Sequence, residues 1–123
     1  MKFYRCELCG NIIVKLVNGG GVLSCCGQEM TELKAGVVDA ALEKHVPAFQ
    51  REGATLLVQV GEIIHPMTPE HYIQCIVVQQ GDHVQYVTLD STDEPKATFQ
   101  INPDEPATIY EYCNLHGLWK AEA

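Results

Sequence analysis

Residues 71–90 read HYIQCIVVQQGDHVQYVTLD. Two runs rich in β-branched and aromatic residues, His71 to Val78 and His83 to Asp90, flank the turn-forming residues Gln80-Gly81-Asp82. A short turn with glycine between two such runs is typical of a β-hairpin. We therefore expect two adjacent antiparallel strands in this part of the chain.

Short runs of the same kind continue on both sides of the hairpin, with turn-forming residues between them and no long helical period. They predict strands over Ala54 to Val60, Ala97 to Ile101 and Ala107 to Tyr112. Between Ala40 and Phe49 we expect a loop, because Pro47 would interrupt a helix there. Strands at this spacing predict an all-β fold, an immunoglobulin-like antiparallel β-sandwich.

The first 35 residues differ from the rest of the chain. They hold four of the six cysteines, a triple glycine at 19–21 and two short strand-like runs, 12–17 and 22–24. So small a segment cannot bury enough apolar surface to fold alone, and a metal ion or a partner must stabilise it. We therefore expect two domains, residues 1–35 and 36–123.

The composition excludes several classes of protein. The formal net charge is −8 and the eight basic residues are scattered, so nothing neutralises the phosphates of a nucleic acid. No apolar run approaches the roughly 18–20 residues of a membrane span. The N-terminus lacks the apolar stretch of a secretory signal and enters a cysteine motif at once, which indicates a cytoplasmic protein.

The clustered cysteines indicate metal ligands rather than disulfides, because a reducing cytosol disfavours disulfides. The pattern is Cys6-x-x-Cys9-Gly10 and then, fifteen residues later, Cys25-Cys26-Gly27. Two such arms satisfy the tetrahedral preference of zinc or iron for four thiolates. A structural zinc ribbon is one interpretation. The adjacent second pair argues against it, because zinc ribbons normally use spaced pairs.

A second group of metal-binding side chains lies in or beside turns and at strand ends. Imidazole suits iron, copper, zinc and nickel, and a thiolate beside it favours redox metals. Five donors satisfy a five-coordinate ion and leave a sixth position for a small ligand. The motifs are Glu43-Lys44-His45-Val46-Pro47, His65-Pro66-Met67, Glu70-His71-Tyr72-Ile73 and Cys113-Asn114-Leu115-His116-Gly117-Leu118-Trp119.

With these motifs the sequence resembles the desulfoferrodoxin and superoxide reductase family over nearly its whole length. At the N-terminus it is similar to the desulforedoxin module in Tyr4, the four cysteines, the triple glycine and Met30. The resemblance implies two iron ions per chain. The first would be held by Cys6, Cys9, Cys25 and Cys26, and the second by equatorial His45, His65, His71 and His116 with axial Cys113.

The resemblance also implies an activity, the one-electron reduction of superoxide to hydrogen peroxide, with a rubredoxin-type electron donor and a homodimeric protein. Lys44 resembles the family lysine that attracts superoxide and helps to supply protons. Glu43 resembles the family carboxylate that closes onto the sixth position of the oxidised iron. Apart from the motif, the two residues would be an ordinary exposed charge pair.

Two alternatives explain part of the sequence. A cupredoxin-like electron carrier would bind copper through Cys113, His116 and an upstream histidine, but no methionine follows Met67 as an axial ligand and three further histidines would be unused. A rubredoxin-like carrier without catalysis, or a zinc-ribbon binding module, explains the first four cysteines and none of the histidines.

Three other residues are not expected to bind metal. His83 follows a turn and should face solvent. Cys75 shares strand parity with His71 and Ile73, so its unligated thiol should point towards the core, at a position where the family usually has an aromatic residue. Trp119 should pack over the second metal site.

Overall fold

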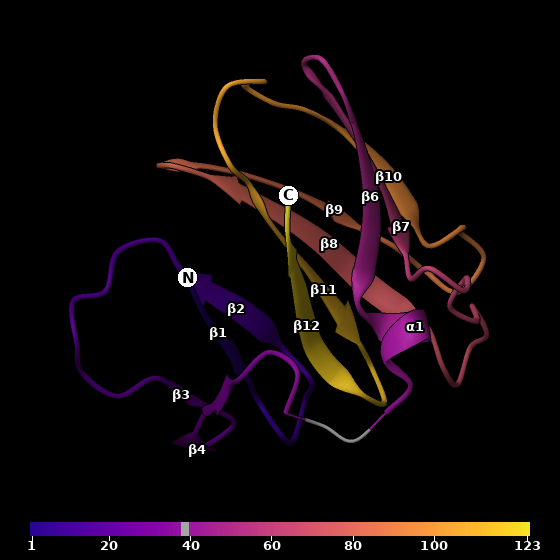
Figure 1. Cartoon of the computed structure of the whole chain (residues 1–123). Helices are drawn as coiled ribbons and strands as arrows, with labels where there is room; N and C mark the ends of the chain where they lie inside the picture. Colours follow the sequence, from indigo (N-terminus) through magenta and orange to yellow (C-terminus); the bar gives the residue numbers. More distant parts are fainter. Residues whose placement is uncertain (38–39) are drawn as a thin grey trace. The chain divides into compact units, whose positions relative to one another are not determined.

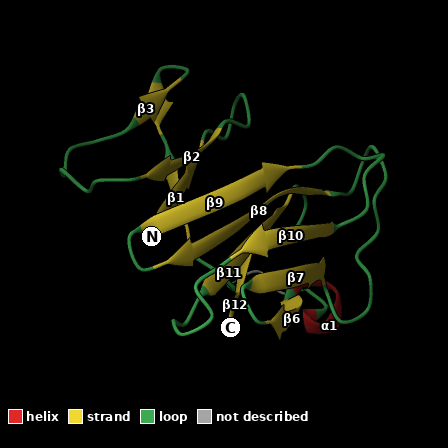
Figure 2. Ribbon diagram, turned by 90° about the horizontal axis from the view of Figure 1, so that it is seen from above, coloured by secondary structure: helices red, strands yellow, loops and turns green. Residues whose placement is uncertain are grey.

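The computed structural model describes residues 1–37 and 40–123. The chain divides into two compact units, Met1–Lys34 and Ala35–Ala123. Both are built from antiparallel strands, as Figures 1 and 2 show, which confirms the predicted all-β fold. No helix in the described residues is long and apolar enough to cross a membrane.

The first unit contains a three-stranded sheet in the order β2-β1-β5 and a small hairpin of β3 and β4. Phe3, Cys6 and Met30 are buried in it. The predicted strand at 22–24 is mostly wrong, because pairing begins only at Ser24, where the chain turns back through Cys26-Gly27. The strands are β1 Lys2–Arg5, β2 Ile12–Lys15, β3 Ser24–Cys25, β4 Gln28–Glu29 and β5 Thr31–Leu33.

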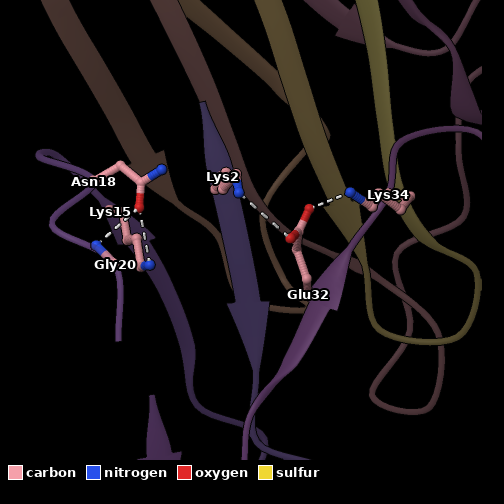
Figure 3. A network of polar contacts seen from close by, with 6 residues as sticks. All are labelled: Lys2, Lys15, Asn18, Gly20, Glu32 and Lys34. Atoms are coloured by element: carbon pink, nitrogen blue, oxygen red, sulfur yellow. Dashed lines mark hydrogen bonds and ion pairs between the residues drawn. The ribbon is translucent and has the colours of Figure 1, made fainter. Parts of the chain in front are cut away.

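Polar contacts hold the edges of the three-stranded sheet (Figure 3). Glu32 on β5 accepts a hydrogen bond from Lys34 and lies 3.9 Å from the Lys2 ammonium on β1. Beyond β2, the Asn18 side-chain oxygen accepts hydrogen bonds from Lys15 Nζ at 3.2 Å and from the Gly20 amide at 3.4 Å. The contacts of Asn18 shape the loop that enters the triple glycine, and all of these exposed contacts contribute little stability.

The second unit is an antiparallel β-sandwich. One sheet has the order β10-β7-β6 and the other the order β12-β11-β8-β9. The core lies between them and includes Leu56 and Val58 of one sheet and Ile76 and Ile109 of the other. The strands are β6 Pro47–Glu52, β7 Thr55–Val60, β8 Ile73–Gln80, β9 His83–Thr88, β10 Lys96–Gln100, β11 Thr108–Cys113 and β12 Gly117–Glu122.

The predicted hairpin is confirmed, with Gln80 paired to His83 and Gly81 at a φ of 60°. The loop expected between Ala40 and Phe49 is wrong. That segment contains one helical turn, α1 Leu42–His45, and the start of β6. Pro47 opens β6, which lies at the edge of the order β10-β7-β6, so its missing N–H is tolerated at the first residue of an edge strand.

Strand β8 contains an irregularity that sequence parity did not reveal. Ile73 pairs with Cys113, but the next pair is Cys75 with Tyr112, so Gln74 is an extra residue in the ladder. Beyond it Ile76 and Val78 join the core, and Cys75 lies on the opposite face. The prediction that Cys75 points into the core is therefore wrong. It is a half-buried free thiol whose pKa burial raises to about 11.

Candidate metal centres

The second unit brings five separate metal-binding side chains to one point. His45 is the last residue of α1, His65 lies in the loop after β7, and His71 lies just before β8. Cys113 ends β11 and His116 lies in the turn between β11 and β12. Their donor atoms all lie within 4.8 Å of one another. The sandwich therefore gathers loops from both sheets around a single site.

The four imidazoles form a closed square. Going round it, ring centroids of neighbours are 4.6–5.0 Å apart and neighbouring planes meet at 78–89°. The opposite rings His45 and His71 are 6.3 Å apart and inclined by only 26°. Four rings so arranged direct one nitrogen each towards a common centre, as a planar set of four ligands requires.

Hydrogen bonds determine which nitrogen each ring presents. His45 Nδ1 lies 2.8 Å from the Ala41 carbonyl oxygen and His65 Nδ1 lies 2.7 Å from that of Pro66. A carbonyl accepts only, so both Nδ1 atoms carry the proton and Nε2 is left with its lone pair. His116 turns Nδ1 inward instead, 3.0 Å from His45 Nε2. The site thus uses rings in two orientations.

The spacing of these nitrogens fits a metal ion. His45 Nε2 and His65 Nε2 are 3.2 Å apart, although both are lone-pair atoms that cannot hydrogen-bond to each other. Two nitrogens bound at right angles to one ion, at about 2.1 Å each, lie about 3 Å apart. His71 Nε2 is also buried without a hydrogen-bond partner among the described residues. A cation at the centre would satisfy all of these atoms.

The protonation states suit a metal site as well. Burial lowers the pKa of His65 to about 4 and lowers those of His45 and His71, so these rings are neutral at pH 7. Burial raises the pKa of the Cys113 thiol, while hydrogen bonds from the His116 and Leu115 amides lower it in part. A metal ion must therefore displace a proton from Cys113, and the backbone amides of His116 and Leu115 stabilise the resulting thiolate.

Two neighbouring side chains, those of Asn114 and Trp119, hold the ligands in place. Asn114 Oδ1 accepts a hydrogen bond from the Tyr72 amide at 2.9 Å, and its Nδ2 donates to the Glu70 carbonyl at 3.0 Å. Trp119 Nε1 donates to the His116 carbonyl at 3.0 Å. The Trp119 ring also lies 5.2 Å from that of His45, which confirms its predicted packing over the site. The role of Asn114 was missed, although it lies within the Cys113–His116 motif.

Glu43 and Lys44 are exposed on α1, directly before His45. The pKa of His71 is lowered first by burial, then by His116 and His45, and also by the charge of Lys44, so the ammonium lies close enough to influence that ring. His83 is confirmed as solvent-facing, since its side chain is 86% exposed and 3.6 Å from Asp82.

The four cysteines of the first unit form the other cluster. Sulfur–sulfur distances are 3.6 Å for Cys9 and Cys25 and 3.9 Å for Cys25 and Cys26. Four sulfurs bound tetrahedrally at about 2.3 Å lie about 3.8 Å apart, so the cluster fits one ion. A hydrogen bond from the Cys9 amide, the largest of several causes, lowers the pKa of Cys6 to about 6. That thiolate is ready for a metal at neutral pH.

The adjacent pair Cys25-Cys26 is accommodated by an unusual backbone. Cys26 has a φ of 52° and Gly27 a φ of 75°, so both residues lie in the left-handed region. Neighbouring side chains on an extended strand point apart, but this turn brings the Cys26 sulfur back towards that of Cys25. This explains why residue 27 is a glycine, since glycine adopts left-handed backbone angles without steric cost.

Neither alternative interpretation accounts for the second cluster. A copper carrier that used Cys113 and His116 would leave other histidines apart, yet His45, His65 and His71 share the same centre. A zinc-ribbon module explains the first cluster alone.

Comparisons with known proteins agree with this geometry. The Desulfoferrodoxin family model matches residues 37–122 and the model of the desulfoferrodoxin N-terminal domain matches residues 1–33. Desulfoferrodoxins of Syntrophotalea carbinolica and Nitratidesulfovibrio vulgaris are 43% and 45% identical, each over 99% of this chain and 96% of the relative. The crystal structure of the superoxide reductase from Treponema pallidum is 33% identical with a TM-score of 0.79, and the match covers 98% of this chain and 97% of that one. The chain therefore belongs to the desulfoferrodoxin family.

Proposed function

We propose that this chain is a superoxide reductase that converts superoxide to hydrogen peroxide at an iron ion held by five residues. The closed square of four imidazoles, with the buried Cys113 thiol at the same centre, carries the proposal. Curated relatives from Pyrococcus horikoshii and Pyrococcus abyssi are named superoxide reductase, at 37% and 38% identity. The ligands are His45, His65, His71, His116 and Cys113.

When bound, iron in this site supplies the one electron that each superoxide ion receives. The chain's own contribution is charge and access. A ferrous ion carries two positive charges, neutral imidazoles add none and the thiolate adds one negative charge. The loaded site would therefore have a formal charge of about +1, which attracts the superoxide anion. Cys113 is fully buried at the end of β11, so the thiolate that would hold the iron is shielded from solvent.

Lys44 and Glu43, both exposed beside the ligand His45, act on the approaching substrate in this proposal. The Lys44 ammonium draws the anion inwards and supplies protons through water, since two protons are consumed for each hydrogen peroxide formed. Glu43 would offer its carboxylate as a further ligand to the oxidised iron. The exposed position of both residues one and two places before His45, and the influence of Lys44 on His71, support these roles.

The module of residues 1–35 holds a second iron through Cys6, Cys9, Cys25 and Cys26, and the domain of residues 36–123 performs catalysis. A rubredoxin-type protein in the cytoplasm supplies the electrons. All six cysteines are free thiols, which suits a reducing compartment.

The protein acts as a homodimer through its N-terminal module. That module exposes large apolar side chains, and a unit of this size rarely folds without further stabilisation. A second copy of the chain would bury these side chains. They are Leu8, Leu16, Val17 and Val22. Sedimentation equilibrium tests this: a monomer at micromolar concentration would contradict the dimer.

The experiment for the activity combines metal analysis with kinetics. The purified protein should contain two iron ions per chain, and the reduced form should consume pulse-generated superoxide with formation of hydrogen peroxide and no dioxygen. His71→Ala should abolish that reaction and keep the spectrum of the four-cysteine iron. Dioxygen as a product would indicate a dismutase and contradict the proposal.

A further inference from the structure

Gly61 lies at the contact between helix α1 and the loop after β7, two segments that each carry a metal ligand. It is a buried residue directly after β7, and the loop that it begins leads to His65. A Cβ atom built on Gly61 would lie 2.8 Å from the Glu43 carbonyl oxygen, 2.8 Å from the Lys44 carbonyl carbon and 2.9 Å from the Val46 carbonyl oxygen. All three are backbone atoms, so no side-chain rotation could make room.

The need for glycine here is a matter of space. Gly53, in the turn at the other end of β7, has a φ of +60° and nothing within 4 Å of an added Cβ. Gly61 shows the reverse. Its φ is not left-handed, but an added Cβ would lie closer to the backbone of residues 43–46 than van der Waals contact allows. Any other residue at 61 would push the segment 43–46 away.

Hydrogen bonds lock the same contact. The Ile63 amide donates to the Glu43 carbonyl at 2.8 Å, which joins the loop after β7 to helix α1. Within that loop the His65 amide donates to the Val60 carbonyl at 2.7 Å, and Gln59 Nε2 donates to the Gly61 carbonyl at 2.9 Å. Neither segment can therefore shift at residue 61 without moving its ligand.

We propose that Gly61 is a positioning residue that sets the separation of His45 and His65 and the place of Lys44 beside them. His45 lies two residues beyond Glu43, and its Nε2 is 3.2 Å from that of His65. A shift of the backbone at Gly61 would change the distance between these two nitrogens, because short, hydrogen-bonded segments connect the contact to both histidines. The effect on metal binding does not depend on the reaction; the effect on Lys44 rests on the proposed function.

The test is Gly61→Ala in the full-length, iron-loaded protein, with the four-cysteine iron of the same molecule as an internal reference. Iron should leave the second site for a chelator about 10–100-fold more readily, the range found when groups that orient ligands are altered. Iron in the first site should be retained as in the wild type. The absorption band of the oxidised second site should also shift, which a change in stability alone would not produce.

Gly53→Ala is the matched control, because it strains a turn of the same sheet far from the ligand loops. It should lower the unfolding temperature and leave second-site iron unchanged. Equal loss of second-site iron in Gly53→Ala and Gly61→Ala, or wild-type retention in Gly61→Ala, would overturn the proposal.

A second pair of variants covers the case in which Gly61→Ala does not fold. Ile63→Pro removes the amide that donates to Glu43, and Ile63→Ala keeps the amide and trims an exposed side chain. Only the proline variant should weaken the second site, and equal affinity in both would count against the proposal. If the wild type binds iron but does not reduce superoxide, the proposed function fails, while these affinities still decide the role of Gly61.

Discussion

Asn114→Ala should loosen the second metal site by releasing the loop that carries His71. The Asn114 side chain accepts one hydrogen bond from the Tyr72 amide and donates one to the Glu70 carbonyl, at 2.9 and 3.0 Å. Each bond contributes about 1 kcal/mol net, so the metal-free protein should lose about 2 kcal/mol of unfolding free energy. For a domain of this size that corresponds to a fall of about 8–16 °C in unfolding temperature.

The assay is thermal unfolding of the metal-free protein by circular dichroism, together with the rate at which iron leaves the loaded protein. Asn114→Asp keeps the acceptor for the Tyr72 amide and loses the donor to Glu70, so it should show about half of the loss. Leu115→Ala is the control, because this neighbouring side chain is 58% exposed. If Asn114→Ala and Leu115→Ala unfold at the same temperature and release iron equally fast, the reasoning is refuted.

Three further predictions concern the core, the substrate and pH. Gln80→Leu should lower the free energy of unfolding by about 2–4 kcal/mol, because the buried side-chain amide hydrogen-bonds to the backbone of Asn102 and Glu105. Denaturant unfolding measures this, with Gln79→Leu as the control, and equal unfolding midpoints for the two variants would contradict it. Lys44→Ala should lower the rate constant with superoxide several-fold at low salt and flatten its salt dependence, whereas Lys44→Arg should keep both; an unchanged rate in Lys44→Ala at low salt would exclude steering. Burial lowers the pKa of His65 from 6.5 to about 4, so the unfolded chain takes up a proton at a higher pH than the folded chain does. The metal-free protein should therefore lose stability as the pH falls from 6.5 to about 4, by at most about 1.4 kcal/mol per pH unit. Melting curves from pH 7 to pH 4 test this, and His65→Gln should remove that part of the slope.

Local patterns were enough to predict strands β2 and β7 to β11. The hairpin around Gly81 and the strands of the sandwich core follow from alternation and turn residues, which act over a few neighbours. The short strands β1, β4, β5, β6 and β12 were not predicted. They are two to six residues long, and each is stabilised by its partner strand rather than by its own composition. The extra residue at Gln74 is likewise decided by pairing with β11.

The sequence by itself determined which residue types are available for chemistry: four clustered cysteines, four histidines in short motifs and the Cys113-x-x-His116 pair. Ligand type is a property of the residue, so it is visible without a structure. Only the tertiary structure decided the rest. The square of imidazoles, the nitrogen that each ring turns inward and the contact at Gly61 join segments separated by as many as 71 residues. Such contacts depend on how two sheets pack, and no local pattern in the chain encodes that distance.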